Sequence, residues 1–144
     1  MHFLIITANF YNDLSEELTL GAVEFLEVEG HSYHKITVPG SLEIAAVISY
    51  AADLDLYDGF VALGCIIRGE TIHHEIVANE TTRALSDLAV NMNLAIGNGV
   101  ISAENKTQAI ERAYRNKRNK GAAAANTSLK MAIIRDKFQE MLVT

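Results

Sequence analysis

Tryptophan is absent from this 144-residue chain, and cysteine and proline occur once each. A single cysteine cannot close an internal disulfide, which excludes the small secreted scaffolds that disulfides hold together. Cys65 lies within an apolar run and suits a reducing compartment, so we expect the protein in the cytoplasm. One proline and no low-complexity stretch exclude the collagen-like and disordered classes.

Positive charge is also scarce. Twelve basic residues face eighteen acidic ones, which gives a formal net charge of -6. The overall field that would attract nucleic acid or an anionic membrane is missing, so we expect neither as a partner. The exception is a basic segment at Arg112, Arg115, Lys117, Arg118 and Lys120. Its spacing suits either a solvated loop or contact with one anionic group.

Long apolar runs are missing as well. No segment approaches the length of a membrane span, and the N-terminus lacks the basic start and cleavage site of a signal peptide. Hydrophobic residues nevertheless make up 49% of the chain. That proportion in a chain of this length predicts one globular domain, residues 1–144, around one core.

Short β-branched apolar runs alternate with longer amphipathic segments, which predicts βαβ units and a parallel sheet. The predicted strands are Phe3–Ala8, Ser32–Val38, Phe60–Ile67 and Leu94–Ile101. The predicted fold is therefore α/β: a doubly wound, three-layer αβα sandwich with a four-stranded parallel sheet, flavodoxin-like in topology.

Polar residues mark the predicted helix starts. Asp13 with Glu16 resembles a capping box, and Ser41 and Thr71 are placed to cap the second and third helices. The third helix is expected to bury a set of apolar residues, namely Ile76, Val77, Ala84, Leu85 and Leu88. Two further helical segments are predicted, a short one within 102–114 and a long closing one within 120–142.

Ligands of doubly wound sheets bind beyond the carboxyl ends of the strands, so the loops there hold the candidate site. The loop after the first strand lacks the glycines of a dinucleotide fingerprint or a P-loop and offers Phe10. An aromatic ring there either packs or stacks on a flat heterocycle. After the second strand, Glu43 either complements a helix dipole or accepts hydrogen bonds from a polyol.

The loop after the third strand combines an anion seat with histidines. Backbone N–H groups of residues 69–71 and the Thr71 hydroxyl precede a helix, where the dipole favours a phosphate. The same dipole favours a neutral imidazole at His73, able to take or give a proton near pH 7. The alternative for His73 and His74 is a pair of imidazoles that are solvated or satisfied by hydrogen bonds, without a role in a site. Residues 76–78 offer no metal ligand at helical spacing, so we expect no metal site.

Four segments together resemble the lumazine synthase family over nearly the whole chain. They are VPGSLEIA, ALGCIIRGETIHHEIVANE, GVISAEN and QAIERAYRNKRNKGAAAA. The resemblance implies condensation of 5-amino-6-(D-ribitylamino)uracil with 3,4-dihydroxy-2-butanone 4-phosphate to 6,7-dimethyl-8-ribityllumazine. Phosphate and water are released in this penultimate step of riboflavin biosynthesis, and neither cofactor nor metal takes part.

The resemblance also implies residue roles. Phe10 stacks on the pyrimidine, Glu43 meets the ribityl hydroxyls, and His73 is the proton donor and acceptor. Ser41 and Leu42 hold the ring and the ribityl chain, and Cys65, Ile66 and Ile67 line the heterocycle through their backbone. Glu70 and Thr71 bind the phosphate. Asn98, Arg112 and Lys120 come from an adjacent subunit, with Arg112 on the phosphate.

The family builds its sites between subunits of a homo-oligomer, and we expect a pentamer or a pair of pentamers here. Asn9 and Asn98 depart from the family's commonest residues, a basic and an aromatic one, which is expected to alter substrate affinity. Two other functions fit the same fold: a non-catalytic binder of flavin or lumazine, and a shell-forming protein. Intact His73 and Arg112 favour the enzyme over the binder.

Overall fold

The computed structural model describes residues 1–142, and these contain a four-stranded, all-parallel sheet with strand order β2-β1-β3-β4. The strands are β1 (His2–Ala8), β2 (Ser32–Val38), β3 (Gly59–Ile67) and β4 (Ile96–Ala103). The predicted strands are confirmed, although β4 begins two residues late. The reason is the left-handed turn at Asn93, with φ of 55°, which makes residues 94 and 95 a connector.

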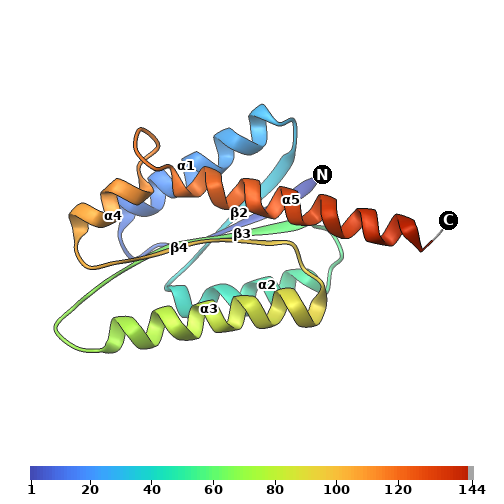
Figure 1. The fold of residues 1–144 in the computed structure, drawn as a ribbon. Coiled ribbons are helices and arrows are strands. Elements are labelled where there is room, and N and C mark those ends of the chain that lie inside the picture. Colours follow the sequence, from blue (N-terminus) through green and yellow to red (C-terminus); the bar gives the residue numbers. More distant parts are fainter. Residues whose placement is uncertain (143–144) are drawn as a thin grey trace.

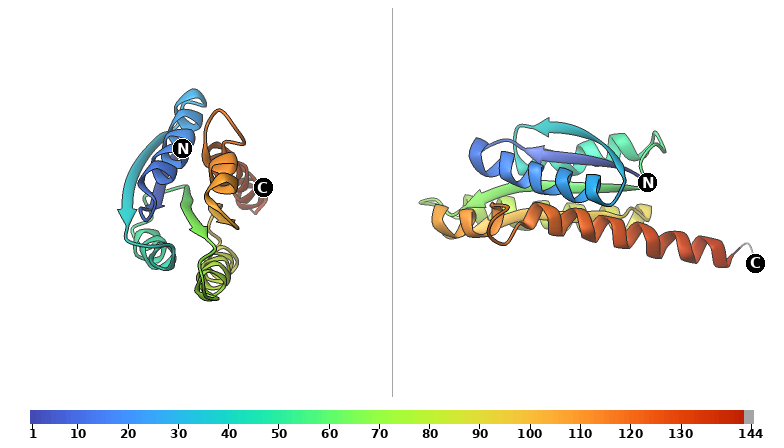
Figure 2. Two further views of the ribbon diagram at one scale, coloured as in Figure 1. Left: turned by 90° about the vertical axis from the view of Figure 1, so that its left-hand side faces the viewer. Right: turned by 90° about the horizontal axis from the view of Figure 1, so that it is seen from above.

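Helices cover both faces of the sheet (Figures 1 and 2). One face carries α1 (Asn12–Val28), α4 (Lys106–Ala113) and α5 (Lys120–Met141). The other carries the short 3₁₀ helix η1 (Ser41–Glu43), α2 (Ile44–Ala52) and α3 (His73–Met92). This arrangement confirms the predicted three-layer α/β fold. Among the described residues, no helix combines the length and hydrophobicity that crossing a membrane needs.

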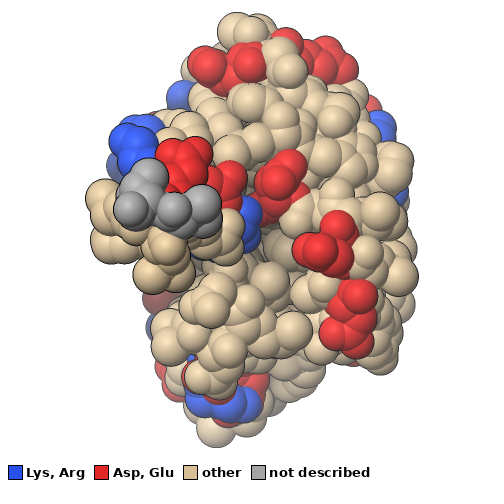
Figure 3. All heavy atoms as spheres, turned by 90° about the vertical axis from the view of Figure 1, so that its right-hand side faces the viewer, with Lys and Arg blue, Asp and Glu red and all other residues tan. Residues whose placement is uncertain are grey.

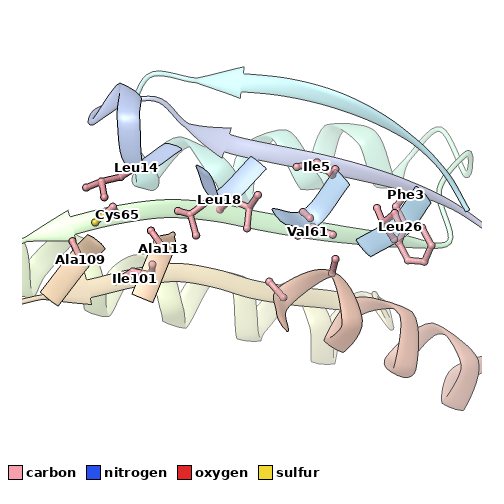
Figure 4. Close-up of a cluster of buried hydrophobic side chains, with 14 of the residues drawn as sticks. Phe3, Ile5, Leu14, Leu18, Leu26, Val61, Cys65, Ile101, Ala109 and Ala113 are labelled. Atoms are coloured by element: carbon pink, nitrogen blue, oxygen red, sulfur yellow. The ribbon is translucent and has the colours of Figure 1, made fainter. Parts of the chain in front are cut away.

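A hydrophobic core lies on each side of the sheet. Figure 4 shows the first, in which Leu14 of α1 lies near Cys65 of β3 and the cluster continues through Leu18 to Val61; Leu14, Leu18 and Val61 are fully buried. On the opposite side, Ile6 of β1 packs with Ile44 of α2. Burial of each such side chain stabilises the folded state by about 1.5–3 kcal/mol. Because both faces of the sheet are apolar, helices cover both of them, and the sheet becomes the middle layer.

Two predicted helix starts are wrong. Tyr11 occupies the N-cap of α1, and Asp13 lies inside the helix, where it accepts a hydrogen bond from Lys106 at 3.1 Å. That hydrogen bond holds the pKa of Asp13 below its ordinary value. Ser41 does not cap α2, because the turn after Pro39 first forms η1, whose N-cap is Gly40. Tertiary pairing thus outweighs the local capping pattern.

The buried stripe of α3 is narrower than predicted. Leu85 is buried as expected, but half of the Ile76 side chain is exposed. Val77, Ala84 and Leu88 are only half-buried, and Val77 lines a pocket beyond the carboxyl end of β3. The prediction for Ile76 is therefore wrong.

Close backbone contact joins α5 to its neighbours. A Cβ atom added to Gly97 of β4 would overlap the carbonyl oxygen of Ala124, and one added to Gly121 would overlap the carbonyl of Leu18. Only glycine fits at these two positions, because a backbone carbonyl cannot swing aside as a flexible side chain can.

Replacing Gly97 with alanine is expected to lower the free energy of unfolding by about 1–3 kcal/mol, the usual cost of overpacking. Urea unfolding followed by circular dichroism measures the change. Gly69→Ala is the matched control, since a Cβ there meets no atom within 4 Å. Equal stability of the two variants would contradict the contact between β4 and α5.

Candidate functional site

A pocket of about 340 Å³ lies at the carboxyl ends of β1, β2 and β3. The chain adds β2 on one side of β1 and then returns to add β3 on its other side. The pocket lies at this change of direction, where doubly wound sheets bind their ligands. Its lining residues are Phe10, Tyr11, Gly40, Ser41, Leu42, Glu43, Cys65, Ile66, Ile67, Gly69, Thr71, His73, His74 and Val77. The opposite end of the molecule shows acidic groups and separated basic ones rather than a basic patch (Figure 3).

The Phe10 ring stands at the mouth of the pocket. Its side chain is 73% exposed, and Tyr11 supports it edge-on with ring centroids 5.0 Å apart. An exposed aromatic ring gains free energy when a flat ligand covers it. The Phe10 ring is therefore not packed in the core, and its face is open to a flat ligand or to another packing partner.

Glu43 faces the pocket from the loop after β2. Its carboxylate lies over Gly40, where an added Cβ would come within 2.9 Å of Oε2. The backbone N–H of Glu43 also donates to the Gly40 carbonyl at 3.1 Å. A side chain at position 40 would displace the carboxylate, so the glycine helps to hold an acceptor suited to ligand hydroxyls.

Cys65 forms part of the pocket wall, and its side chain belongs to the core cluster with Leu14 and Ala109 (Figure 4). Burial, assisted by the negative charge of Asp13, raises the pKa of the Cys65 thiol to about 11. The thiol is therefore protonated at neutral pH, and a protonated thiol is a poor nucleophile.

Alkylation of Cys65 in the folded protein is expected to be at least about 100-fold slower than in the unfolded chain, because the raised pKa reduces the thiolate fraction by that factor. Mass spectrometry after iodoacetamide treatment at pH 8, with and without urea, measures both rates. The stability that burial gives the neutral thiol is complete below its ordinary pKa of 9.0 and is lost as the pH rises through about 11. Equal alkylation rates would contradict a buried thiol.

The start of α3 brings Thr71 and His73 to the pocket. The Thr71 hydroxyl accepts a hydrogen bond from the backbone N–H of His73 at 3.3 Å, although the helix proper begins two residues after Thr71. Both side chains are exposed to the pocket. A hydroxyl, helical N–H groups and an imidazole at one point suit an anion and a proton transfer.

The sequence left His74 as a solvated or hydrogen-bonded imidazole without a role in the site. The structure shows the second state, because its Nδ1 atom lies 3.1 Å from the Thr71 carbonyl oxygen and its side chain is only 13% exposed and lines the pocket. Tyr11, Gly40 and Val77 also line the pocket, although they are not among the predicted site residues. Each neighbours a predicted site residue or lies on the same helical face, which is the only sequence signal for them.

Four predicted site residues lie outside this pocket. Glu70 is exposed on the loop between β3 and α3, beside two residues that line the pocket. Asn98 is exposed on the edge strand β4, where its side chain accepts the N–H of Val100 at 2.9 Å. Arg112 and Lys120 lie on α4 and at the start of α5. The fold of one chain does not bring the last three together with His73.

The basic segment is more ordered than a solvated loop. Arg115 donates to Glu17 at 2.9 Å and also pairs with Glu24, both on α1. These hydrogen bonds raise the pKa of Arg115, the one to Glu17 most. Arg112 is half-buried, and with Lys117 and Arg118 it lines a groove of about 390 Å³. Arg115 thus anchors the loop, while Arg112 remains available for an anion.

Metal ligands do not gather in the part of the chain that the structure describes. Within residues 1–142, no group of three or more histidine, cysteine or carboxylate side chains is placed to hold an ion. The pocket itself presents an aromatic surface, a carboxylate, a helix start and imidazoles.

Comparison with known proteins agrees with this geometry. The model of the 6,7-dimethyl-8-ribityllumazine synthase family matches residues 1–136. The protein of that name from Bartonella bacilliformis is 52% identical, and the alignment covers 95% of this chain and 91% of the relative. The one from Bartonella tribocorum is 51% identical, with 95% of this chain and 91% of the relative covered. The one from Agrobacterium fabrum is 50% identical, with 95% of this chain and 96% of the relative covered. The chain therefore belongs to the 6,7-dimethyl-8-ribityllumazine synthase family.

Proposed function

We propose that this pocket condenses 5-amino-6-(D-ribitylamino)uracil with 3,4-dihydroxy-2-butanone 4-phosphate to 6,7-dimethyl-8-ribityllumazine, in riboflavin biosynthesis. The observation that carries the proposal is the single pocket that unites Phe10, Glu43, Thr71 and His73 in a chain of this family. A flat heterocycle, a polyol chain and a phosphate ester each meet a matching group there. Cys65 is a free thiol, which is typical of proteins in a reducing compartment. This agrees with a biosynthetic enzyme of the cytoplasm.

The pyrimidine substrate occupies the part of the pocket nearest β1 and β2. The exposed ring of Phe10 stacks on the heterocycle, and the Glu43 carboxylate accepts hydrogen bonds from the ribityl hydroxyls. Ser41 and Leu42 hold the ring and the start of the ribityl chain. The backbone of residues 65–67 borders the heterocycle while the Cys65 side chain stays in the core.

The phosphorylated ketone occupies the start of α3. Glu70 and Thr71 hold the phosphate with the backbone N–H groups of the turn, where the helix dipole favours an anion. The amine of the pyrimidine attacks the ketone, water leaves as the imine forms, phosphate is eliminated, and the ring closes as the ribityl-bearing amine attacks the second carbonyl and a second water leaves. His73 takes and gives the protons of these steps.

Holding both substrates together contributes most of the rate. Alignment of two reactants can lower a barrier by about 7–11 kcal/mol, whereas acid–base catalysis by one side chain typically contributes about 10²- to 10⁴-fold. The pocket therefore acts first by positioning, and His73 adds a smaller factor.

We further propose a homo-oligomer whose sites lie between subunits, with Asn98, Arg112 and Lys120 supplied by a neighbour. Arg112 then completes the phosphate seat with a guanidinium group, which binds phosphate in a bidentate manner. Exposed apolar side chains on α5, such as Ile134 and Phe138, support association. A pentamer or a pair of pentamers is the assembly we expect, and light scattering measures its mass.

Mixing the purified protein with both substrates tests the function. Lumazine absorbance and fluorescence should appear only when both substrates are present, and phosphate should be released in equal amount. Binding of the pyrimidine without product would identify a binder instead of an enzyme. No product at saturating concentrations of both substrates would overturn the proposal.

A further inference from the structure

His74 makes contact with the turn that presents Thr71. Its Nδ1 atom lies 3.1 Å from the Thr71 carbonyl oxygen. A carbonyl only accepts hydrogen bonds, so Nδ1 carries the proton and donates it. Of the two neighbouring histidines, His74 is the one whose ring is tied down and mostly buried, at 13% exposure.

The helical hydrogen bonds of α3 do not hold this carbonyl. The ladder begins at Ile72, whose carbonyl accepts the N–H groups of Glu75 at 3.0 Å and Ile76 at 3.3 Å. One residue earlier, the Thr71 carbonyl accepts a side-chain donor instead. The Thr71 hydroxyl accepts the N–H of His73. Thr71 is thus fastened at both its hydroxyl and its carbonyl, by two successive histidines.

The segment that depends on this fastening is otherwise exposed. Residues 68–73 are all solvent-exposed, and an added Cβ on Gly69 would meet no atom within 4 Å. The backbone is held at the start of the segment, where the Arg68 N–H donates to the Ala103 carbonyl at 2.9 Å, but residues 69–72 have few contacts to hold them in one conformation. A hydrogen bond from a mostly buried ring therefore has a large share in fixing where Thr71 and the adjoining N–H groups point.

We propose that His74 is a positioning residue for the phosphorylated substrate, acting through Thr71. The inference rests on the proposed function, because it takes the turn at residues 69–71 as the phosphate seat. The Nε2 atom of the same ring lies 4.0 Å from Oε1 of Glu75.

Two variants separate the hydrogen bond from the bulk of the ring. His74→Phe keeps an aromatic ring but loses the donor. His74→Asn loses the ring but keeps an N–H donor at the place of Nδ1. In His74→Phe, the KM for 3,4-dihydroxy-2-butanone 4-phosphate should rise about tenfold, the worth of one well-placed hydrogen bond. The KM for the pyrimidine should stay within about twofold, and His74→Asn should restore most of the loss.

Amide hydrogen exchange gives a readout that does not need turnover. Exchange of the backbone N–H groups of His73, Glu75 and Ile76, which donate to the Thr71 hydroxyl and the Ile72 carbonyl, should quicken about tenfold in His74→Phe and much less in His74→Asn, because the same bond limits opening of the turn. Faster exchange in His74→Phe supports the positioning role of His74 even if the wild-type protein proves inactive, in which case only the proposed function fails. If the wild type is active and His74→Phe leaves both the KM values and the exchange rates unchanged, the positioning role is overturned and the function stands. Equal rises in both KM values, or no rescue by asparagine, would likewise overturn the positioning role.

Discussion

Replacing His73 with alanine is expected to lower kcat by about 10²- to 10⁴-fold while leaving measurable turnover. The imidazole stands at the start of α3 beside Thr71, inside the same pocket as Phe10 and Glu43. The substrates remain aligned when the ring is removed, and alignment supplies the larger part of the rate enhancement. Steady-state kinetics with each substrate varied in turn measures both kcat and the two KM values.

The controls for this prediction separate catalysis from folding. His34→Ala is the matched variant, because His34 lies on β2 with its ring against Tyr57, away from the pocket. Its kcat should equal that of the wild type. Both KM values of His73→Ala should remain within a few-fold, since the proton transfers belong to the transition state. Wild-type kcat in His73→Ala would remove this residue from the mechanism.

Arg112→Ala is expected to raise the KM for the phosphorylated ketone by about 10- to 100-fold, the effect of losing a charge-assisted hydrogen bond to an anion. The KM for the pyrimidine should change little. Arg118→Ala is the matched control, because this arginine lines the same groove on α4 and the following loop but has no proposed contact with substrate. Unchanged kinetics in Arg112→Ala would refute its role in phosphate binding.

The position of Arg112 outside the pocket of its own chain allows a sharper experiment. Chains carrying His73→Ala and chains carrying Arg112→Ala are co-expressed or refolded together and assayed at a low concentration of the phosphorylated ketone. If each site takes His73 from one subunit and Arg112 from another, random assembly restores about one site in four. A mixture no more active than the mean of the separate variants would show that each site lies within one chain.

Some features of the fold followed directly from local patterns. The strand Ser32–Val38 was predicted with the bounds that it has, and β3 differs by one residue. Gly30 follows α1 with a positive φ of 80°, the left-handed conformation that glycine commonly adopts directly after a helix. Such signals are local, because strand and helix periodicity and glycine angles involve residues close together in the chain.

Other features depended on partners that are distant in sequence. Asp13 looked like part of a capping box but pairs with Lys106, and the basic run around Arg115 looked like a solvated loop but is anchored on Glu17. In each case the competing partner lies on an element far along the chain. Local patterning cannot weigh such contacts.

By itself, the sequence determined the alternation of strands and helices, the family segments and the loops that carry the chemistry. These rest on side-chain periodicity and residue type, which are properties of short stretches. The tertiary structure decided which residues share the pocket. It turned His74 onto the Thr71 carbonyl, directed the Cys65 side chain into the core and left Arg112 outside. The physical reason is that the direction of a side chain depends on packing against distant elements, which the order of residues does not reveal.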